Sequence, residues 1–584
     1  MLKTLCAFSG VLLLVTFSAE GQVRPEADLC AVPPGAQPLL PARLMDGMGI
    51  TNMPVTTSSE EARKFFNQGI SQMHSFWFLE SERSFLQAAT LDPNMAMAYW
   101  GISVSAAGDY RPAFQLIRDP NEGGRMGSPE ATSASATTIP RSTSGAALSP
   151  VIRAREAAEK AVSLRDKVSA RERMYIDAEW ARRNPESKTR DADHIAALRQ
   201  LMTAHPDDEE AASILGLALL DGYDSVTKQP RTNTLEGIAL LEKVVANNNA
   251  HFGAHHYLIH GYEGSETPER AWHACRRYPE LVPNIPHALH MPGHIYAQSD
   301  RIDDAIAAFA AAAENERGYM KADVLYPNGH HGHNVHFMIH SLNLDGRYED
   351  SIKAVRHLMN DFKETPRERS GSNQRVTYRQ GYYGLVKTLV RFQKWDVILD
   401  GTTIPAYDRP EQHAWRLWAT GLAQASTGQI DKARVTLREM SDHVKKAEGS
   451  RRPLAIAEME LDATVTAYGG DRAKAWTTFR KAAATEAALI YTEPPSYPRP
   501  VAEGMGNTAL AIGDAKVAEE GYREALAREP GSGHAFFGVA AALQAQGRIV
   551  ESRLAYERGL IRWDKADVDM FKRKPMLRTE APRQ

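Results

Sequence analysis

A pattern of about 34 residues recurs along the chain, and this repetition limits the possible folds more than any other feature. In each unit, small residues fall where two helices would cross and a proline closes the unit. Residues 62–93 carry Gly69 and Pro93 at these positions, and residues 499–530 carry Gly506 in the same frame. A unit this short cannot bury its apolar face alone, so successive units must stack side by side.

Helical hairpins with this spacing are typical of tetratricopeptide repeats. We therefore predict an all-α fold, a tetratricopeptide-like α-solenoid of antiparallel helical hairpins. The chain of 584 residues is too long for one compact core, which agrees with a repeat array. Its hydrophobic content of 43% and charged content of 24% are ordinary for a protein that folds in water.

The organisation of the chain follows from where the repeat pattern is clear, weak or missing. Residues 125–150 are rich in Ser, Thr, Ala and Pro without apolar periodicity, which predicts a mobile loop. The predicted segments are a signal peptide (1–22), an extended lead-in (23–57), N-terminal repeat hairpins (58–124), the low-complexity loop (125–150), degenerate hairpins (151–245), central histidine-rich repeats (246–360), further degenerate hairpins (361–490), C-terminal repeats (491–565) and a tail (566–584).

The N-terminus predicts export. Lys3 is followed by an apolar run over residues 5–17 and then by the small residues Ser18 and Ala19. This arrangement is typical of a secretory signal peptide, with cleavage expected between Ala19 and Gly21. We therefore expect a soluble protein in the periplasm or outside the cell.

Composition argues against several other classes of protein. The net charge of −3 gives no sign of a basic surface for nucleic acid. No segment after the N-terminus approaches the ~20 apolar residues of a membrane-spanning helix. After cleavage Cys30 and Cys275 remain. They could form a disulfide outside the cytoplasm, although a buried free thiol at Cys275 is the interpretation we prefer.

The histidines are concentrated in the central repeats, where 13 of the 20 lie between His251 and His340. Three pairs occupy positions 5 and 9 of the first helix in three consecutive repeats: His256 and His260, His290 and His294, and His336 and His340. Position 2 adds His287 and His333, and position 12 adds Glu263. Positions with this spacing share one face of a helix.

A histidine pair four residues apart on a helix can chelate a transition metal, and imidazole suits Zn and Cu. The six paired histidines are therefore predicted metal ligands, around one ion with spare histidines or around two nearby ions. Glu263 is a candidate general base. Residues predicted to contact a ligand or to support the metal ligands are His251, His287, His333, Tyr262, His74, Glu493 and Arg499. Three alternatives stay open: neutral imidazoles that bind a ligand directly, a pH-responsive surface, and a pattern copied by repeat duplication.

Three stretches resemble a family of exported bacterial tetratricopeptide repeat proteins. They are residues 54–101, HFGAHHYLIHGYEG followed by PHALHMPGHIYAQSDRIDDAI, and EPPSYPRPVAEGMG with the closing hairpins. The resemblance implies an α-solenoid whose histidine-bearing helices line a concave groove, and it brings no assigned reaction. Phe252 stands where relatives have proline. Matched by motif, the resemblance implies a functional set of His251, His256, His260, His287, His290 and His294.

Two functions follow from these observations. The first is a binding module that holds a peptide, protein or small molecule in a histidine-lined concave groove, together with a transition metal. The second is a metal-dependent enzyme, hydrolase-like or oxidoreductase-like, that uses the same histidines. Repeat proteins most often act as binding modules, which favours the first function. The shared register of the histidines favours the second function, a metal-dependent enzyme.

Overall fold

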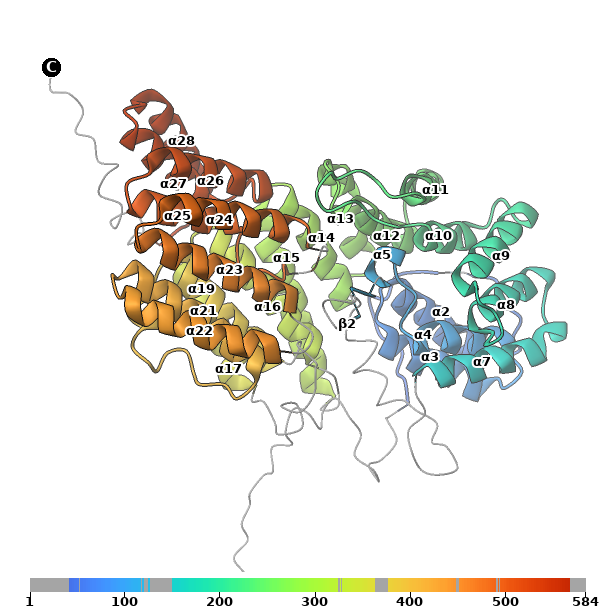
Figure 1. Ribbon diagram of the computed structural model, residues 1–584. Coiled ribbons are helices and arrows are strands. Elements are labelled where there is room, and N and C mark those ends of the chain that lie inside the picture. Colours follow the sequence, from blue (N-terminus) through green and yellow to red (C-terminus); the bar gives the residue numbers. More distant parts are fainter. Residues whose placement is uncertain are drawn as a thin grey trace, which may run out of the picture.

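The computed structural model describes residues 41–51, 53–116, 118–119, 124–125, 150–323, 326, 328–362, 377–447, 451–489, 492 and 494–567. Within these residues the chain is built from helices that pair as antiparallel hairpins (Figure 1). Strand pairing there is limited to a two-residue antiparallel pair, Arg118–Asp119 with Gly124–Arg125, and an isolated bridge between Tyr223 and Pro230. The predicted all-helical, tetratricopeptide-like fold is confirmed. The predicted signal peptide, most of the lead-in and low-complexity loop, Cys30, Glu493 and the tail beyond residue 567 lie outside the described residues.

The N-terminal half begins with helices whose ends are capped by side chains. Ser59 accepts a hydrogen bond from the backbone of Ala62 at the start of α2, and Ser169 and Glu172 form a capping box at α8. The helices are α2 (Glu60–His74), α3 (Phe78–Leu91), α4 (Ala96–Ala106), α5 (Ala113–Leu116), α7 (Pro150–Leu164), α8 (Ala170–Arg183), α9 (Arg190–Ala204), α10 (Glu209–Ala218) and α11 (Thr234–Asn247).

The central and C-terminal helices continue the array. The central helices are α12 (Phe252–Tyr262), α13 (Trp272–Leu281), α14 (Pro286–Gln298), α15 (Ile302–Ala322), α16 (Gly329–Leu344) and α17 (Tyr348–Asp361). The C-terminal helices are α19 (Thr377–Arg391), α20 (Trp395–Ile398), α21 (Pro410–Ser426), α22 (Ile430–Lys446), α23 (Arg451–Tyr468), α24 (Arg472–Ala487), α25 (Val501–Ala511), α26 (Ala515–Arg528), α27 (Gly533–Ala545) and α28 (Ile549–Arg562). No described helix has both the length and the apolar character needed to cross a membrane.

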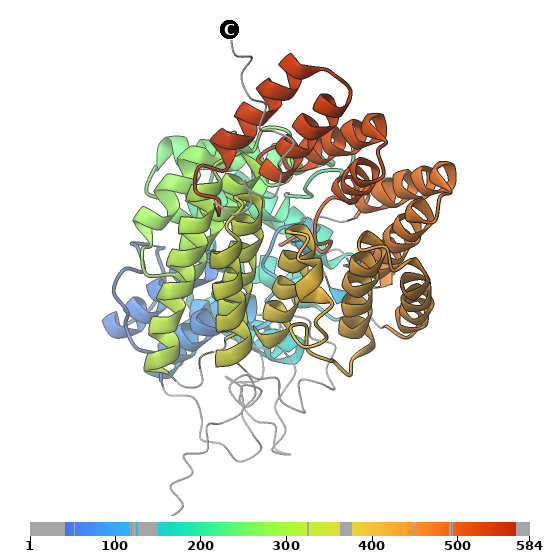
Figure 2. The same ribbon diagram turned by 90° about the vertical axis from the view of Figure 1, so that its left-hand side faces the viewer.

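The helical array curves back toward its centre in both the N-terminal and the C-terminal half. The central helices lie between these two curved halves (Figures 1 and 2). In the N-terminal half the last residue of α2, His74, is hydrogen-bonded to Tyr257 of α12 at 2.8 Å. In the C-terminal half the indole of Trp563 donates to the carbonyl of Leu344 at the end of α16, at 2.8 Å. The two large clusters of buried apolar side chains meet near α15 and α16. The histidine-bearing helices are therefore enclosed from both sides.

The crossing of α25 and α26 leaves room only for glycine at position 506. A Cβ atom there would lie 2.9 Å from the ring of Tyr522. We therefore expect Gly506→Leu to lower the free energy of unfolding by about 1–3 kcal/mol because it overpacks this crossing. Urea denaturation measures the change, with Gly318→Leu as the control, because a Cβ at Gly318 in α15 meets nothing within 4 Å. Equal stability of the two variants would contradict the packing that the repeat frame requires.

Candidate metal centre

The first helices of the central repeats, α12, α14 and α16, bring their histidines together in two groups of three. The His256 triad consists of His256, His260 and His287, and the His290 triad consists of His290, His294 and His333. In each triad one ring nitrogen per residue lies within 4.8 Å of the other two. Each triad thus joins a pair four residues apart on one helix to a single histidine from the next histidine-bearing helix.

The Nε2 atoms converge in both triads. In the His256 triad, the Nε2 atoms of His256 and His287 are 3.2 Å apart. The Nε2 atom of His260 is buried and has no hydrogen-bond partner among the described residues. In the His290 triad, the Nε2 atom of His290 contacts Nε2 of His294 and lies 3.4 Å from Nε2 of His333. Each triad therefore directs several imidazole nitrogens toward one point.

Glu263 connects the two triads. Nδ1 of His260 donates to Oε2 of Glu263 at 3.0 Å, and Nδ1 of His294 donates to Oε1 at 2.5 Å. Burial alone raises the pKa of Glu263, but the charge of His294 and the hydrogen bonds from both histidines outweigh it and lower the pKa to about 2. An ionised carboxylate with both oxygens engaged is a weak proton acceptor. Its position suits it to orienting histidines, in contrast to the general base expected from the sequence.

Other acceptors fix further rings in the same way. Nδ1 of His256 donates to the backbone carbonyl of His74 at 2.5 Å. The ring of His74 is in turn held by Tyr257 at 2.8 Å and by Glu210 at 2.6 Å. A histidine that donates from Nδ1 carries its lone pair on Nε2, which is the arrangement of a metal ligand. His256, His260 and His294 all have this arrangement.

Five of the six triad histidines are buried and His287 is half-buried, whereas the resemblance implied a histidine-lined open groove. His256 is 0% exposed and His290 is 1% exposed. Burial lowers the pKa of both well below the usual value, and neighbouring histidine charges lower it further. Burial has the same effect on His287. The rings are therefore neutral at physiological pH, the form that binds a metal.

Two residues of the N-terminal half, Phe76 and Arg111, cover the His256 triad, and no sequence pattern pointed to either. Phe76 lies in the turn after α2 with a positive φ of 51°, and its ring centroid is 4.5 Å from that of His256. The same ring stacks on His260 at 5.4 Å. The guanidinium of Arg111 lies 4.8 Å from the Phe76 centroid. A positive φ at a bulky residue marks a strained turn that the surrounding packing maintains.

His330 and Glu316 were also not singled out as a pair from the sequence. Nδ1 of His330 donates to the buried carboxylate of Glu316 at 2.9 Å. The His330 ring centroid lies 5.7 Å from that of His287 and 5.4 Å from that of His290. His330 therefore lies against rings of both triads.

His336 and His340, predicted as ligands, belong to neither triad. Nδ1 of His336 is 3.1 Å from Oε1 of Gln380, and its Nε2 is 3.3 Å from Nζ of Lys387. Three residues beyond His333, the direction of the side chain has rotated by about 60° around α16, so that His336 faces α19. His340 points nearly the same way as His333 but lies about 10 Å farther along the axis. The triads are instead completed by His287 of α14 and His333 of α16, which occupy position 2 of their repeats.

The remaining predicted residues have structural partners. His251 caps α12 by accepting from the backbone of Ala254 at 3.1 Å. The hydroxyl of Tyr262 donates to Glu242 at 2.5 Å. Arg499 is buried and pairs with Glu460 at 2.8 Å. These contacts place Tyr262 and Arg499 outside both triads, whereas His74 supports His256.

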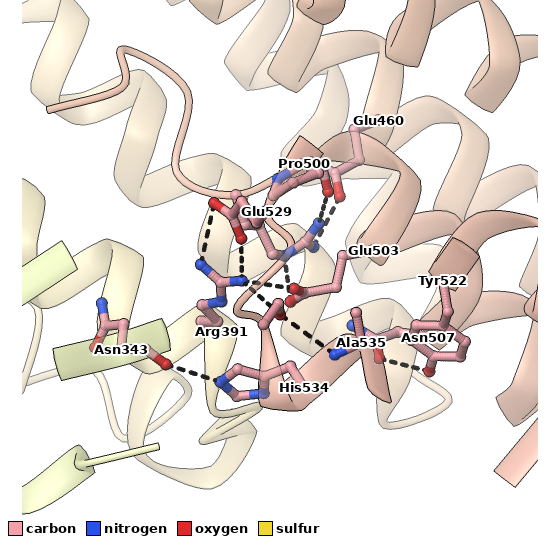
Figure 3. A network of polar contacts seen from close by, with 12 residues as sticks. Asn343, Arg391, Glu460, Pro500, Glu503, Asn507, Tyr522, Glu529, His534 and Ala535 are labelled. Atoms are coloured by element: carbon pink, nitrogen blue, oxygen red, sulfur yellow. Dashed lines mark hydrogen bonds and ion pairs between the residues drawn. The ribbon is translucent and has the colours of Figure 1, made fainter. Parts of the chain in front are cut away.

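Arg499 pairs with Glu460 in a buried network of charges in the C-terminal half, which Figure 3 shows around Arg391, Glu460 and Glu503. Arg391 of α19 pairs with Glu503 of α25 at 2.8 Å and with Glu529, at the end of α26, at 2.5 Å. Each buried charge has a partner of opposite sign, which avoids the cost of an unpaired one. The network joins α19 to the closing hairpins and is separate from the histidine triads.

A third group with metal-binding geometry lies on the outer side of α21 and α22. It consists of His413, Glu439 and His443, and it is more exposed than the two triads. The rings of His413 and His443 stack with centroids 4.2 Å apart. Such an accessible group can take up metal weakly, so it has to be controlled for in any measurement of metal content.

Cys275 is buried and forms no disulfide within the described part of the chain. Burial raises the pKa of its thiol, so the reactive thiolate is suppressed. Its proposed partner, Cys30, lies outside the described residues, and the pairing stays a prediction.

No protein-family model and no curated protein matches this sequence. Among solved structures, human IFIT1 as a dimer with PPP-AAAA is similar, with a TM-score of 0.30, 13% identity and coverage of 86% of this chain and 91% of that chain. Naa15/Naa10 bound to HypK-THB is also similar, with a TM-score of 0.23, 11% identity and coverage of 88% and 73%. Likenesses this distant give no information about function, and the fold assignment depends on the helical hairpins of the chain itself.

Proposed function

We propose that this protein is an exported helical-repeat protein that binds two transition-metal ions, zinc or copper, one in each histidine triad. The observation that carries the proposal is the shared carboxylate of Glu263. One of its oxygens accepts from a histidine of the His256 triad and the other from a histidine of the His290 triad. Carboxylates that accept from Nδ1 in this way are a recurring support of metal-bound histidines.

The hydrogen-bonding capacity of the His290 triad also favours a metal. His294 donates through Nδ1 to Glu263, so its Nε2 carries a lone pair. His290 has one Nε2 proton at most when neutral, yet its Nε2 faces both His294 and His333. A single proton cannot make a good hydrogen bond to both nitrogens, so one of these contacts lacks a proper hydrogen bond, which is unfavourable in a buried place. An ion that accepts all three lone pairs removes the conflict.

The His256 triad supports the same conclusion independently. The buried Nε2 atom of His260 has no hydrogen-bond partner among the described residues, and burying an unpaired polar atom costs about 1–3 kcal/mol. A metal ion bound by His256, His260 and His287 would satisfy it.

Two roles are compatible with these sites. As a binding module, the protein would use the ions to hold a peptide, protein or small molecule. A metal-dependent enzyme is the second candidate, because three protein ligands leave a fourth position open for water or substrate, as in catalytic zinc sites. In either role we assign Glu263 to orienting His260 and His294.

The metal content of the purified protein tests the proposal. We expect the metal-stripped chain to bind two Zn²⁺ or Co²⁺ ions tightly, measured by equilibrium dialysis with elemental analysis. The measurement uses the His443→Ala background, which removes the exposed third group. His205→Ala, at a histidine outside all three groups, is the control and should also bind two ions. A chain that binds none, or only weakly, would contradict the proposed function.

A further inference from the structure

We infer that the two triads form one dinuclear centre, in which the two ions lie close enough to share a small bridging anion such as hydroxide. This inference rests on the proposed function and adds to it, since two separate sites would also bind two ions. It follows from three features that join the triads: the stacking of His287 on His290, the position of His330, and the charge balance of the buried cluster.

His287 and His290 bring the two sets of nitrogens together. They lie three residues apart on α14 and so share one face of that helix. Their rings are stacked, with centroids 5.7 Å apart and planes inclined by 29°. The Nε2 atom of His287 belongs to the His256 triad and that of His290 to the His290 triad. An ion bound by His287 and an ion bound by His290 would therefore lie next to each other, because the two rings are adjacent on one face of α14.

His330 lies against both triads at this junction. Its ring centroid is 5.7 Å from that of His287, 5.4 Å from that of His290 and 5.8 Å from that of His333. Glu316 fixes the ring from the far side through Nδ1. Side chains from α14 and α16 thus contact one another at this junction, in addition to the link through Glu263.

Charge balance explains the bridging anion. Histidines bind a metal ion as neutral imidazoles, so two divalent ions held by the six triad residues would bring four positive charges into this cluster. Glu263 and Glu316 supply two negative charges among the described neighbours, while Arg111 adds a positive one near the His256 triad. Burying uncompensated charge is costly, so we expect an added anion at the ions, and one anion placed between them would serve both. Two-metal sites with shared ligands hold their ions about 3.5–4 Å apart.

Electron paramagnetic resonance of the Cu²⁺-loaded chain tests the inference. The full-length His443→Ala protein is loaded with Cu²⁺, its copper is counted by elemental analysis, and its spins are integrated. Two ions joined by a bridging anion couple their spins, so we expect two coppers per chain and a spin count far below two. Azide should bind at one equivalent per pair of ions and give a new absorption band.

Variants with one damaged triad are the matched controls. His256→Ala and His290→Ala should each bind one copper with one full, uncoupled spin, and circular dichroism checks that each variant retains its helices. If the protein with both triads intact bound two coppers and showed two full, uncoupled spins, the dinuclear centre would be overturned and the proposed function would stand. Fewer than two coppers would instead show that the proposed function itself fails.

Discussion

Replacing His333 with alanine should reduce the metal content from two ions per chain to one, whereas replacing His340 should leave both. The two histidines lie on α16, point in similar directions and are 6% and 7% exposed, so they form a matched pair. Only His333 belongs to a triad. Losing one of three metal ligands should lower the metal affinity of that site at least ~100-fold. Losing a residue that only supports a ligand lowers metal affinity by up to about 100-fold, and the loss of a ligand itself should cost no less.

Competition with a chromogenic chelator measures this difference directly. The comparison also separates two hypotheses, because the helical register alone assigns His336 and His340 as ligands, while the folded chain assigns His287 and His333. His287→Ala against His336→Ala repeats the test on the other triad. If His340→Ala lost an ion and His333→Ala did not, the assignment from the structure would be wrong.

Replacing Glu263 with glutamine should weaken both metal sites at once, by about 10–100-fold each. The glutamine amide has one oxygen to accept with, while its NH₂ group only donates. The Nδ1–H group of either His260 or His294 would then face the NH₂ group of the glutamine, which is also a donor. That ring would have to move its proton to Nε2, the atom that binds the metal, and the remaining site would lose the negative charge of its support.

The simultaneous loss is the diagnostic result, because a variant within one triad affects one ion. Isothermal titration of the metal-stripped variant with Zn²⁺ measures both affinities. Glu242→Gln is the control, since Glu242 is a partly exposed glutamate of α11 that binds Tyr262 and no triad histidine. Unchanged affinity at both sites in Glu263→Gln would refute the supporting role of this carboxylate. Loss at one site only would confine that role to a single triad.

The helical hairpins and the paired histidines of each triad can be predicted from the amino-acid sequence alone. Gly69 and Gly506 lie against Phe85 and Tyr522 at helix crossings, as the repeat frame requires. His256 with His260, and His290 with His294, meet because residues four apart on a helix must share a face. Glu263, three residues after His260, follows from the same local geometry. Each of these relations lies within one helix or one hairpin, where the period of the helix sets the distances.

The histidine that completes each triad, and the residues around it, follow from how the helices pack in the folded chain. The choice of His287 and His333 over His336 and His340 depends on how α14 and α16 are rotated about their axes and displaced along them relative to their neighbours, which helical periodicity does not specify. Phe76 reaches His256 from 180 residues earlier because the N-terminal half curls back onto α12. The same closure buries the triads. Periodicity sets the face of a helix on which a residue lies, whereas the packing between helices sets what that face meets.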